Sequence, residues 1–356
     1  MAVKKKTKPT DSNVVYPIGL GPKNPTEEIS LDRLTSVSYV MPVLNEEKYL
    51  EGAVLSILGQ DFSGPVEVIL ALGPSTDQTD AKAALLATKY QQVRIVRNAA
   101  GTTSAGLNAA IAEAKHQVVV RVDAHSVLSA GYTKLAVELL NETGAANVGG
   151  VMRAVGHTPF QSAVAWAYTS RVGLGGGAFH VGGEAGPADS VYLGVFRREI
   201  FNLVGGFDES VIRGQDWELN LRIRQAGYVV WFDPRLEVEY HPRASLSKLA
   251  KQFWDTGLWR GQLTRKSLAT ANPRYFAPPV LVKVSVIGVI LALGFGWGPG
   301  WLPLLAYLVG ICVAGLTAGR LQLGARTCLL VALPTMHFLW GAGFLVGFVA
   351  GAGKRR

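Results

Sequence analysis

The stretch Val118-Val119-Val120-Arg121-Val122-Asp123-Ala124-His125 is an apolar run with one internal arginine, and it ends in an aspartate and a histidine. A run of β-branched residues bounded by polar ones is typical of a strand buried in a parallel sheet. In open α/β sheets, ligands bind outside the carboxyl ends of the strands. Asp123 and His125 stand two residues apart at such an end, so both side chains can point into one site.

These two residue types suit a divalent cation. A carboxylate is the ligand that a hard ion such as Mg²⁺ prefers, and a borderline ion such as Mn²⁺ accepts an imidazole as well. Asp123 and His125 are therefore candidate metal ligands. From this stretch alone an alternative stays open, in which Asp123 caps the following turn and His125 is merely solvated.

Strands and helices alternate around this stretch. Strands are predicted at 37–44, 66–72, 93–97 and 118–123, and a helical pattern follows each of them. Such alternation is typical of right-handed βαβ units. The sequence therefore predicts an α/β fold with a parallel, doubly wound sheet.

The pattern is less regular beyond residue 147. A glycine-rich segment at 173–186 indicates either mobility or a close approach of the backbone to a ligand, with a plain connector as the alternative. Strands are predicted at 148–154, 189–196, 229–232 and 236–240, and helices at 159–172 and 215–225.

The composition favours a membrane-associated protein. Of the 356 residues, 49% are hydrophobic and 17% are charged, and the apolar excess lies towards the C-terminal end. This leans towards membrane association, and the length allows one large domain with an appendage, or two domains. The net charge is +9, with basic residues gathered at both ends. Beside apolar spans, basic ends favour anionic lipid headgroups, and the lack of a basic–aromatic module argues against nucleic acid as a partner.

The cysteines and the N-terminus bear on location. Cys312 and Cys328 both lie in the apolar tail, so neither a disulfide framework nor a zinc site can be built from them. No apolar segment follows the N-terminal lysines, so we expect no secretory signal peptide and a cytosolic front domain. The predicted segments are a solvated lead-in at 1–35, the α/β domain at 36–244, a basic and aromatic helix at 245–268 and a transmembrane region at 280–350.

The helix at 245–268 and the region after it both point to lipid. Trp254 and Trp259 are interleaved with lysines and arginines, which fits a helix lying in the membrane interface. Packing of that helix on the soluble domain is the alternative. Each of the three apolar stretches that follow approaches or exceeds the ~17 residues that a spanning helix needs. They lie at 280–297, 301–318 and 327–350.

The charges near these stretches suggest an orientation. With a cytosolic front domain, Arg320 and Arg326 fall on the cytosolic side, as the positive-inside rule prefers. A third crossing would place the basic residues at 354–356 outside, against the same rule. Pro334 and His337 interrupt the last stretch, so both crossing and re-entry stay open.

Five short motifs complete the pattern. In residue type and order, these motifs resemble those of the family 2 glycosyltransferases, which have the GT-A fold. The amino-acid sequences at 121–125 and 192–198 are most similar to those of the exopolysaccharide, succinoglycan-type branch. The resemblance covers residues 37–265, and C-terminal spans are also typical of that branch. The motifs are Met41-Pro42-Val43-Leu44-Asn45-Glu46-Glu47, Ser75-Thr76-Asp77-Gln78-Thr79, Asp123-Ala124-His125, Gly205-Gly206-Phe207-Asp208-Glu209 and Gln215-Asp216-Trp217-Glu218.

This resemblance implies a nucleotide-sugar donor, a divalent cation (Mn²⁺ or Mg²⁺) and inversion at the anomeric carbon. An attacking hydroxyl needs a carboxylate to take its proton, as in inverting glycosidases, and the leaving diphosphate needs a cation. Asp216 matches the base of the family. Because it begins a helix, the helix dipole favours its ionised form; a plain helix-starting aspartate is the alternative.

The other site residues follow from the same matches. Asp123 and His125 match the Asp-x-Asp metal motif of the family, with histidine in the last position, and Asp123 is also expected to contact the donor diphosphate. The implied acceptor is a lipid-linked saccharide or a polysaccharide, reached from the cytosolic face of the plasma membrane by a multi-pass protein. Matches on the donor side are Pro42, Asn45, Glu46, Asp77 and Asp123, and those on the acceptor side are Asp189, Gln215, Trp217, Trp259 and Arg260.

The sequence departs from the family at one place. Leu72 and Gly73 stand where an aspartate pair is usual, which leaves the nucleotide undetermined. A catalytically silent GT-A membrane scaffold is therefore one alternative function. A dinucleotide-binding oxidoreductase is another, but it needs Gly-x-Gly-x-x-Gly after the first strand, where this chain has Pro42-Val43-Leu44-Asn45.

Overall fold

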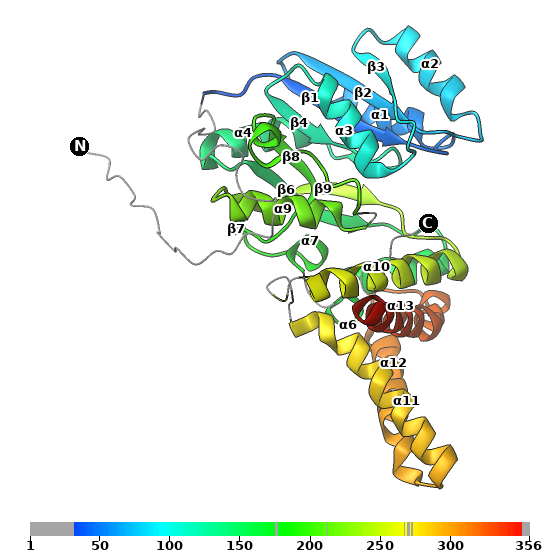
Figure 1. The fold of residues 1–356 in the computed structure, drawn as a ribbon. Coiled ribbons are helices and arrows are strands. Elements are labelled where there is room, and N and C mark those ends of the chain that lie inside the picture. The colour runs from blue at the N-terminus through cyan, green and yellow to red at the C-terminus, as the bar shows by residue number, and fades with distance from the viewer. Residues whose placement is uncertain are drawn as a thin grey trace.

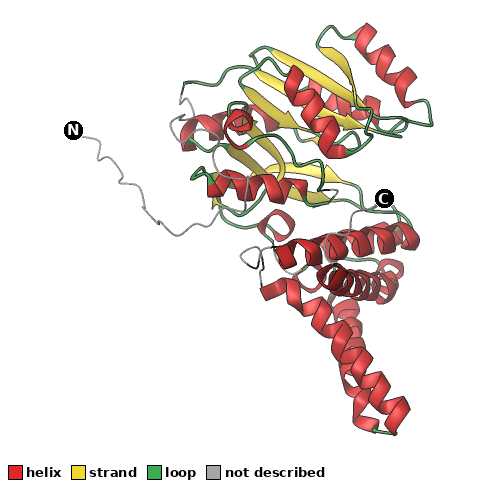
Figure 2. Ribbon diagram, in the orientation of Figure 1, coloured by secondary structure: helices red, strands yellow, loops and turns green. Residues whose placement is uncertain are grey.

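The computed structural model describes residues 32–174, 177–211, 213–266, 268, 271 and 273–350. Nearly all of the predicted lead-in at 1–35 lies outside these residues. An α/β domain is followed by a layer of long helices beneath it, and from this layer a helical hairpin extends away from the domain (Figure 1). Figure 2 shows that all strands belong to the α/β domain.

One mixed sheet of nine strands forms the centre of the domain. Its order is β3-β2-β1-β4-β8-β6-β9-β5, and β7 pairs with β9 outside this path. The strands are β1 Val37–Val43, β2 Val66–Leu72, β3 Val93–Arg97, β4 Val118–Arg121, β5 Val127–Leu128, β6 Asn147–Ala154, β7 Gly186–Pro187, β8 Tyr192–Arg197 and β9 Val230–Tyr240.

The prediction of a parallel sheet is right for the first half of the domain, whereas the second half is mixed: β6 and β9 are parallel, and β5 and β7 are antiparallel to β9. Strands β1, β2, β3 and β4 are parallel, whereas β8 is antiparallel to both of its neighbours, β4 and β6. Residues of β4 and β8 are buried on both faces of the sheet. Such strands have no alternating pattern in either direction, so the sequence does not reveal the direction of β8.

Two predicted strand boundaries also need correction. The strand predicted at 189–196 begins only at Tyr192. The strands predicted at 229–232 and 236–240 are one strand, β9, which passes through Asp233 and Pro234. The Asp233 carboxylate accepts hydrogen bonds from the backbone N–H and the guanidinium of Arg235, at 2.9 and 2.7 Å. This local pairing satisfies a buried charge inside the strand, at the gap between the two shorter strands that were predicted.

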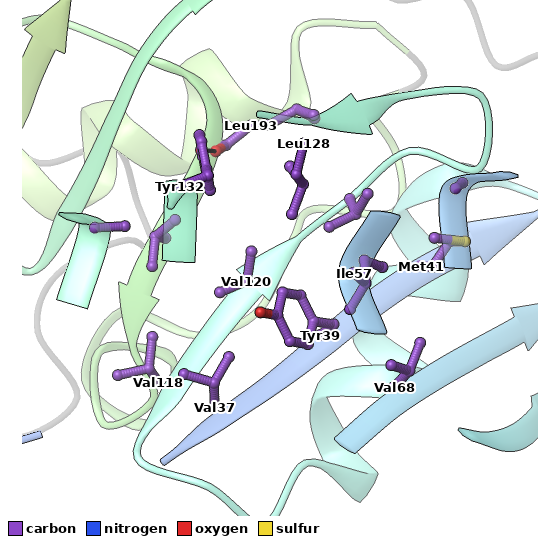
Figure 3. Packing of buried hydrophobic residues seen from close by; sticks show 14 of the residues in the cluster. Val37, Tyr39, Met41, Ile57, Val68, Val118, Val120, Leu128, Tyr132 and Leu193 are labelled. Carbon is purple, nitrogen blue, oxygen red and sulfur yellow. Dashed lines mark hydrogen bonds between the residues drawn. The ribbon is translucent and has the colours of Figure 1, made fainter. Parts of the chain in front are cut away.

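Helices cover both faces of the sheet. One apolar cluster packs α1, α2 and α4 on one face, and part of it is drawn in Figure 3 around Tyr39 and Val120. A second cluster packs α3, α8 and α9 on the other face. The helices are α1 Leu50–Leu58, α2 Thr79–Lys89, α3 Thr103–Glu113, α4 Tyr132–Thr143, α5 Pro159–Tyr168, α6 Arg171–Leu174, α7 Ala178–Val181, α8 Ile200–Val204, α9 Gln215–Gln225, α10 Leu246–Lys266, α11 Ala277–Phe295, α12 Leu302–Thr317 and α13 Leu323–Ala350, with short 3₁₀ helices η2 Pro273–Phe276 and η3 Gly298–Trp301.

A third apolar cluster joins the domain to the C-terminal helices. It combines residues of α5, α10, α12 and α13 with Met152 of β6 and Tyr240 of β9. Within the described residues, three helical segments are long and apolar enough to cross a membrane, at Pro273–Phe295, Gly298–Thr317 and Leu323–Ala350. The three predicted apolar stretches are therefore confirmed as apolar helices of sufficient length.

Helices α10 and α13 lie unusually close together because glycines face each other across their contact. A Cβ atom on Gly257 of α10 would lie 2.0 Å from the backbone oxygen of Trp340, and one on Gly261 would lie 2.1 Å from that of Phe344. On the α13 side, a Cβ on Gly347 would lie 2.0 Å from the oxygen of Leu258. Small residues at such spacing let helix backbones approach each other closely.

We expect Gly257→Ala to destabilise the protein by about 1–3 kcal/mol, the usual cost of overpacking. The new methyl group would overlap the backbone of α13, which has no flexible side chain there to move aside. Gly294→Ala in α11 is the matched control, because nothing lies within 4 Å of its Cβ position. Thermal unfolding of both variants in detergent measures the effect, and equal midpoints would contradict this packing.

Candidate active site

One large cavity lies at the carboxyl ends of the parallel strands. Its volume is about 640 Å³. Its first wall comes from the β1 and β4 ends and from the start of α3, and includes Pro42, Glu46, Asp123 and His125. Its second wall comes from the later part of the chain. That wall includes Tyr168, Leu174, His180, Tyr192, Gln215, Tyr240, Gln252, Phe253, Thr256 and Trp340.

Sheet topology brings the first wall together. β1 and β4 are parallel neighbours, so the residues that follow them meet at one edge of the sheet. Asn45 has a φ of 56°, an uncommon left-handed conformation that asparagine tolerates. Its side-chain oxygen accepts a hydrogen bond from the backbone N–H of Thr76 at 2.7 Å, which ties the β1 end to the β2 end. Asn45 therefore shapes the first wall.

His125 is oriented by Glu46. The Nδ1 atom of His125 lies 2.9 Å from Oε1 of Glu46, and the two residues are 79 positions apart in the chain. Burial would lower the pKa of His125, but the hydrogen bond to Glu46 and the charges of Asp123 and Glu46 outweigh burial and raise it. A ring nitrogen held by a carboxylate leaves the other nitrogen for a metal, an arrangement that metal-binding histidines use widely. The donor set of Asp123 and His125 therefore fits a divalent cation.

Arg121 joins the two carboxylates that the sequence analysis predicts for the metal site and for the catalytic base. Its guanidinium donates to Asp123 at 3.0 Å and also to Asp216, and the Arg121 side chain is only 5% exposed. Burial would raise the pKa of Asp123, but the charges of Arg121 and then His125 hold it below its usual range. Burial raises the pKa of Asp216, with Arg121 opposing the shift and Asp123 adding to it. The two aspartates are thus kept near one buried cation.

Asp216 sits at the start of α9, as predicted. It follows Gly214, which precedes the helix with a φ of 74°. Its side chain is 26% exposed, and the residue before it, Gln215, lines the cavity. A carboxylate has about four lone-pair sites, so Asp216 can keep its bond to Arg121 and still accept a proton from another hydroxyl.

Trp217, Trp259 and Arg260, which were predicted for the acceptor, form a stack together with Tyr275. The Arg260 guanidinium lies 4.7 Å from the ring centre of Trp217, 4.6 Å from that of Trp259 and 4.3 Å from that of Tyr275. Burial lowers the pKa of Arg260 to about 10, so it stays charged at neutral pH. A Cβ on Gly214 would overlap the Trp259 ring at 2.0 Å. This stack fastens α9, which carries Asp216, to α10.

The two remaining predicted residues, Asp77 and Asp189, do not lie in the same part of the structure. The Asp77 carboxylate accepts a hydrogen bond from the backbone N–H of Thr79 at 3.1 Å and another from the backbone N–H of Glu47 at 3.3 Å. Asp77 therefore connects the loop after β2 to the loop after β1, which forms part of the first wall. Asp189 is 75% exposed and pairs with Arg224 at 3.1 Å. It is not among the described residues that line the cavity, and its role in acceptor binding stays a prediction.

The second wall contains residues that the sequence analysis did not assign to the site. His180 and Gln252 line the cavity, and each has a buried polar atom without a hydrogen-bond partner in the described part of the chain, Nδ1 and Oε1. Burial, and then the charge of Arg274, lowers the pKa of His180 to about 3, so its ring is neutral. Trp340 also lines the cavity although it belongs to α13. No local signal marks His180 or Trp340, because only the tertiary fold brings them to the site.

His241 does not join Asp123 and His125. Its ring lies 4.9 Å from that of His157, and its Nε2 lies 3.5 Å from Glu239. These three residues form a group whose ligand atoms lie within 4.8 Å of one another. Glu239 already pairs with Arg153 at 2.6 Å.

The chain has clear relatives among known proteins. The model of "Glycosyl transferase family 2" matches residues 38–205. Succinoglycan biosynthesis protein ExoA of Rhizobium meliloti (strain 1021) is 32% identical over 326 residues, covering 89% of this chain and 96% of ExoA. A Methanococcus voltae enzyme, dolichyl N-acetyl-α-D-glucosaminyl phosphate 3-β-D-2,3-diacetamido-2,3-dideoxy-β-D-glucuronosyltransferase, is 24% identical over 88% of this chain and 96% of its own length.

A solved structure shares the fold. Mannosyltransferase PcManGT from Pyrobaculum calidifontis, in complex with GDP-Man and Mn²⁺, superposes with a TM-score of 0.61. It covers 93% of this chain and 90% of its own, at 19% sequence identity. The match extends over the C-terminal helices as well as the α/β domain, because it covers nearly the whole chain.

Proposed function

The chain belongs to glycosyl transferase family 2, and we propose that it is an inverting enzyme that moves one sugar from a nucleoside-diphosphate donor to a lipid-linked acceptor at the cytosolic face of the plasma membrane. One observation carries the acceptor half of this proposal. The cavity that holds Asp123 and His125 is closed on its other side by Thr256 of α10 and Trp340 of α13. Part of the second wall of the site thus comes from α10, which leads into the apolar region, and from α13, which belongs to it.

The relatives agree with such an acceptor. The name of the Methanococcus voltae enzyme describes a sugar acceptor carried on a dolichyl phosphate, and that of ExoA describes the making of succinoglycan, a polysaccharide. A lipid-carried acceptor needs an entrance at the level of the headgroups. The basic helix α10, with Lys248 and Lys251, is well suited to line that entrance because cations attract anionic headgroups.

In the proposed reaction, the acceptor oxygen forms a bond to the anomeric carbon while the bond from that carbon to the diphosphate breaks. The hydroxyl proton passes to the Asp216 carboxylate, and the bonding electrons leave with the diphosphate. A single displacement of this kind inverts the anomeric centre, as in inverting glycosidases. Arg121 holds Asp216 in place through the whole step, and the Arg260 stack fixes the helix that carries it.

A divalent cation completes the donor side. Asp123 and His125 are the residues that would hold it, with Glu46 orienting the His125 ring. When bound, such an ion offsets the charge that develops on the leaving diphosphate. Around it, the Pro42 and Asn45 turn closes the donor side of the cavity.

The acceptor half is tested in membranes from cells that lack the protein. We expect them to accumulate a glycolipid one sugar shorter than in the parent, detected by mass spectrometry of solvent-extracted lipids. Wild-type protein should restore the longer lipid, and an Asp216→Asn variant present at the same level should not. An unchanged glycolipid profile together with altered soluble saccharides would overturn the lipid-linked acceptor. Restoration by the variant would instead support the silent scaffold.

A further inference from the structure

The three apolar helical segments differ in what surrounds them. About 17% of the apolar window of Pro273–Phe295 and 22% of that of Gly298–Thr317 is buried inside the protein, compared with 39% for Leu323–Ala350. The α11–α12 hairpin extends away from the domain, whereas α13 lies beneath α10 at an angle to the hairpin (Figure 1). Of these three segments, only the two that form the α11–α12 hairpin are both largely exposed and directed away from the domain, as a membrane-inserted hairpin would be.

The middle of α13 is bound to the catalytic domain. Nε2 of His337 lies 2.9 Å from the backbone oxygen of Val172 and 3.2 Å from that of Gly173, both in the segment after α5. Leu333 and Met336 are completely buried in the apolar cluster that includes α5 and Tyr240. Trp340, one turn further along, lines the catalytic cavity.

Helix α10 packs along α13 in a parallel orientation. The close contacts pair residues 257 and 261 of α10 with 340 and 344 of α13, so the two helices run in the same direction. Any crossing by α13 at this contact would take α10 into the bilayer as well. The charges of Lys251, Asp255 and Arg265 would go with it, and charged side chains inside a bilayer are expensive.

The expected depth of the cavity in the bilayer also argues against a membrane crossing by α13. Residue 337 lies near the middle of the 28-residue helix α13. If α13 crossed the membrane, its middle would lie near the bilayer centre, and the cavity that Trp340 lines together with Arg121, Asp123 and His125 would reach down to that depth. An aqueous donor carrying a diphosphate could not reach them there.

We propose that α13 does not cross the membrane but lies with α10 in the headgroup–acyl boundary of one leaflet, and that only the α11–α12 hairpin enters the bilayer. The outward side chains of α13, which include Leu330, Val331, Val346 and Val349, then face lipid. Both ends of α13 lie on the side of the catalytic domain. Arg320 and Arg326 then fall on that one side, in agreement with the positive-inside rule.

This proposal rests on the membrane association contained in the proposed function, and the depth of two labels tests it. Nitroxides are attached to cysteines introduced at Val331 and Val346, both exposed on α13, at 48% and 45%, in a full-length protein whose native cysteines are replaced by alanine. Along a spanning helix centred near residue 337, these sites would lie about 9 and 14 Å from the bilayer centre, on opposite sides of it, at 1.5 Å per residue. In the proposed arrangement both lie at a similar, shallow depth in the same leaflet. A membrane-impermeant reductant added outside lipid vesicles should therefore remove both electron paramagnetic resonance signals to the same extent, and oxygen and nickel-chelate accessibilities measure the depth of each label.

Val284 and Leu293 of α11 are the matched controls, exposed at 41% and 72%. We expect their labels to differ in depth, since the hairpin enters the bilayer. Reduction of the Val331 and Val346 labels from opposite sides of the membrane would overturn the proposal while leaving the enzymatic function intact. Release of the protein from membranes by alkaline carbonate would remove the membrane association itself, and the proposal with it.

Discussion

Replacing Asp216 with asparagine is expected to lower turnover by about 10²–10⁴-fold, the usual contribution of a positioned general base, with little change in donor affinity. Asparagine keeps the shape of the side chain and an oxygen that can accept the hydrogen bond from Arg121. It removes only the ability to accept the acceptor proton. Single-turnover transfer and direct donor titration, measured on the same preparation, separate these two effects.

Asp208→Asn is the control for this substitution. Asp208 is exposed, lies close in sequence, and accepts a hydrogen bond from the backbone N–H of Ser210 at 2.8 Å. We expect it to retain most of the activity. If Asp216→Asn keeps substantial turnover while Asp208→Asn loses activity, the general base has been assigned to the wrong carboxylate.

The pH dependence has a definite sign. Burial raises the pKa of Asp216, even though Arg121 opposes the shift. Because the base must be ionised, turnover falls as the pH drops through this raised pKa. The acidic limb of the wild-type profile should therefore lie above the ordinary pKa of an aspartate, which is about 3.9, and it should disappear in Asp216→Asn.

Loss of the cation is expected to have the second large effect. Chelation of divalent ions, or Asp123→Ala, should reduce transfer by about 10³-fold or more, since a metal contributes several kcal/mol and each 1.36 kcal/mol is tenfold in rate. Mn²⁺ should restore chelated wild-type enzyme at least as well as Mg²⁺, because His125 is a softer ligand than a carboxylate. The Asp123→Ala variant should not be restored.

Direct Mn²⁺ titration gives a readout that does not depend on turnover. Asp123→Ala should weaken binding of Mn²⁺ and donor together. Asp80→Ala is the matched control, because Asp80 is exposed in the first turn of α2. Full activity in excess chelator, or unchanged Mn²⁺ binding by Asp123→Ala, would be incompatible with the assignment of Asp123 and His125.

Much of the donor side could be predicted because its signals are local. The strands β1 to β4 each carry their own apolar pattern, and Asp123 and His125 follow one of them directly. Parallel neighbours bring their carboxyl ends together without further information. The family pattern then placed Asp216 at a helix start, where the structure has it.

The arrangement of the acceptor side could not be predicted from the sequence, because it depends on contacts between segments that are far apart in the chain. Arg121 and Asp216 are 95 positions apart, and nothing local shows that one buried guanidinium serves both aspartates. Trp340 belongs to an apolar run of the kind that faces lipid, yet it lines the cavity. Its position follows from the glycine contacts between α10 and α13, which need both helices to be in place.

The most direct test of the account uses purified full-length protein in lipid vesicles with Mn²⁺. The vesicles contain lipids extracted from cells that lack the protein, and a panel of radiolabelled nucleotide sugars is supplied one at a time. We predict that label from one donor enters the solvent-extractable lipid fraction, with the anomeric configuration inverted in the product. Absence of label from that fraction with every donor, while the protein is folded and binds Mn²⁺, would contradict the account.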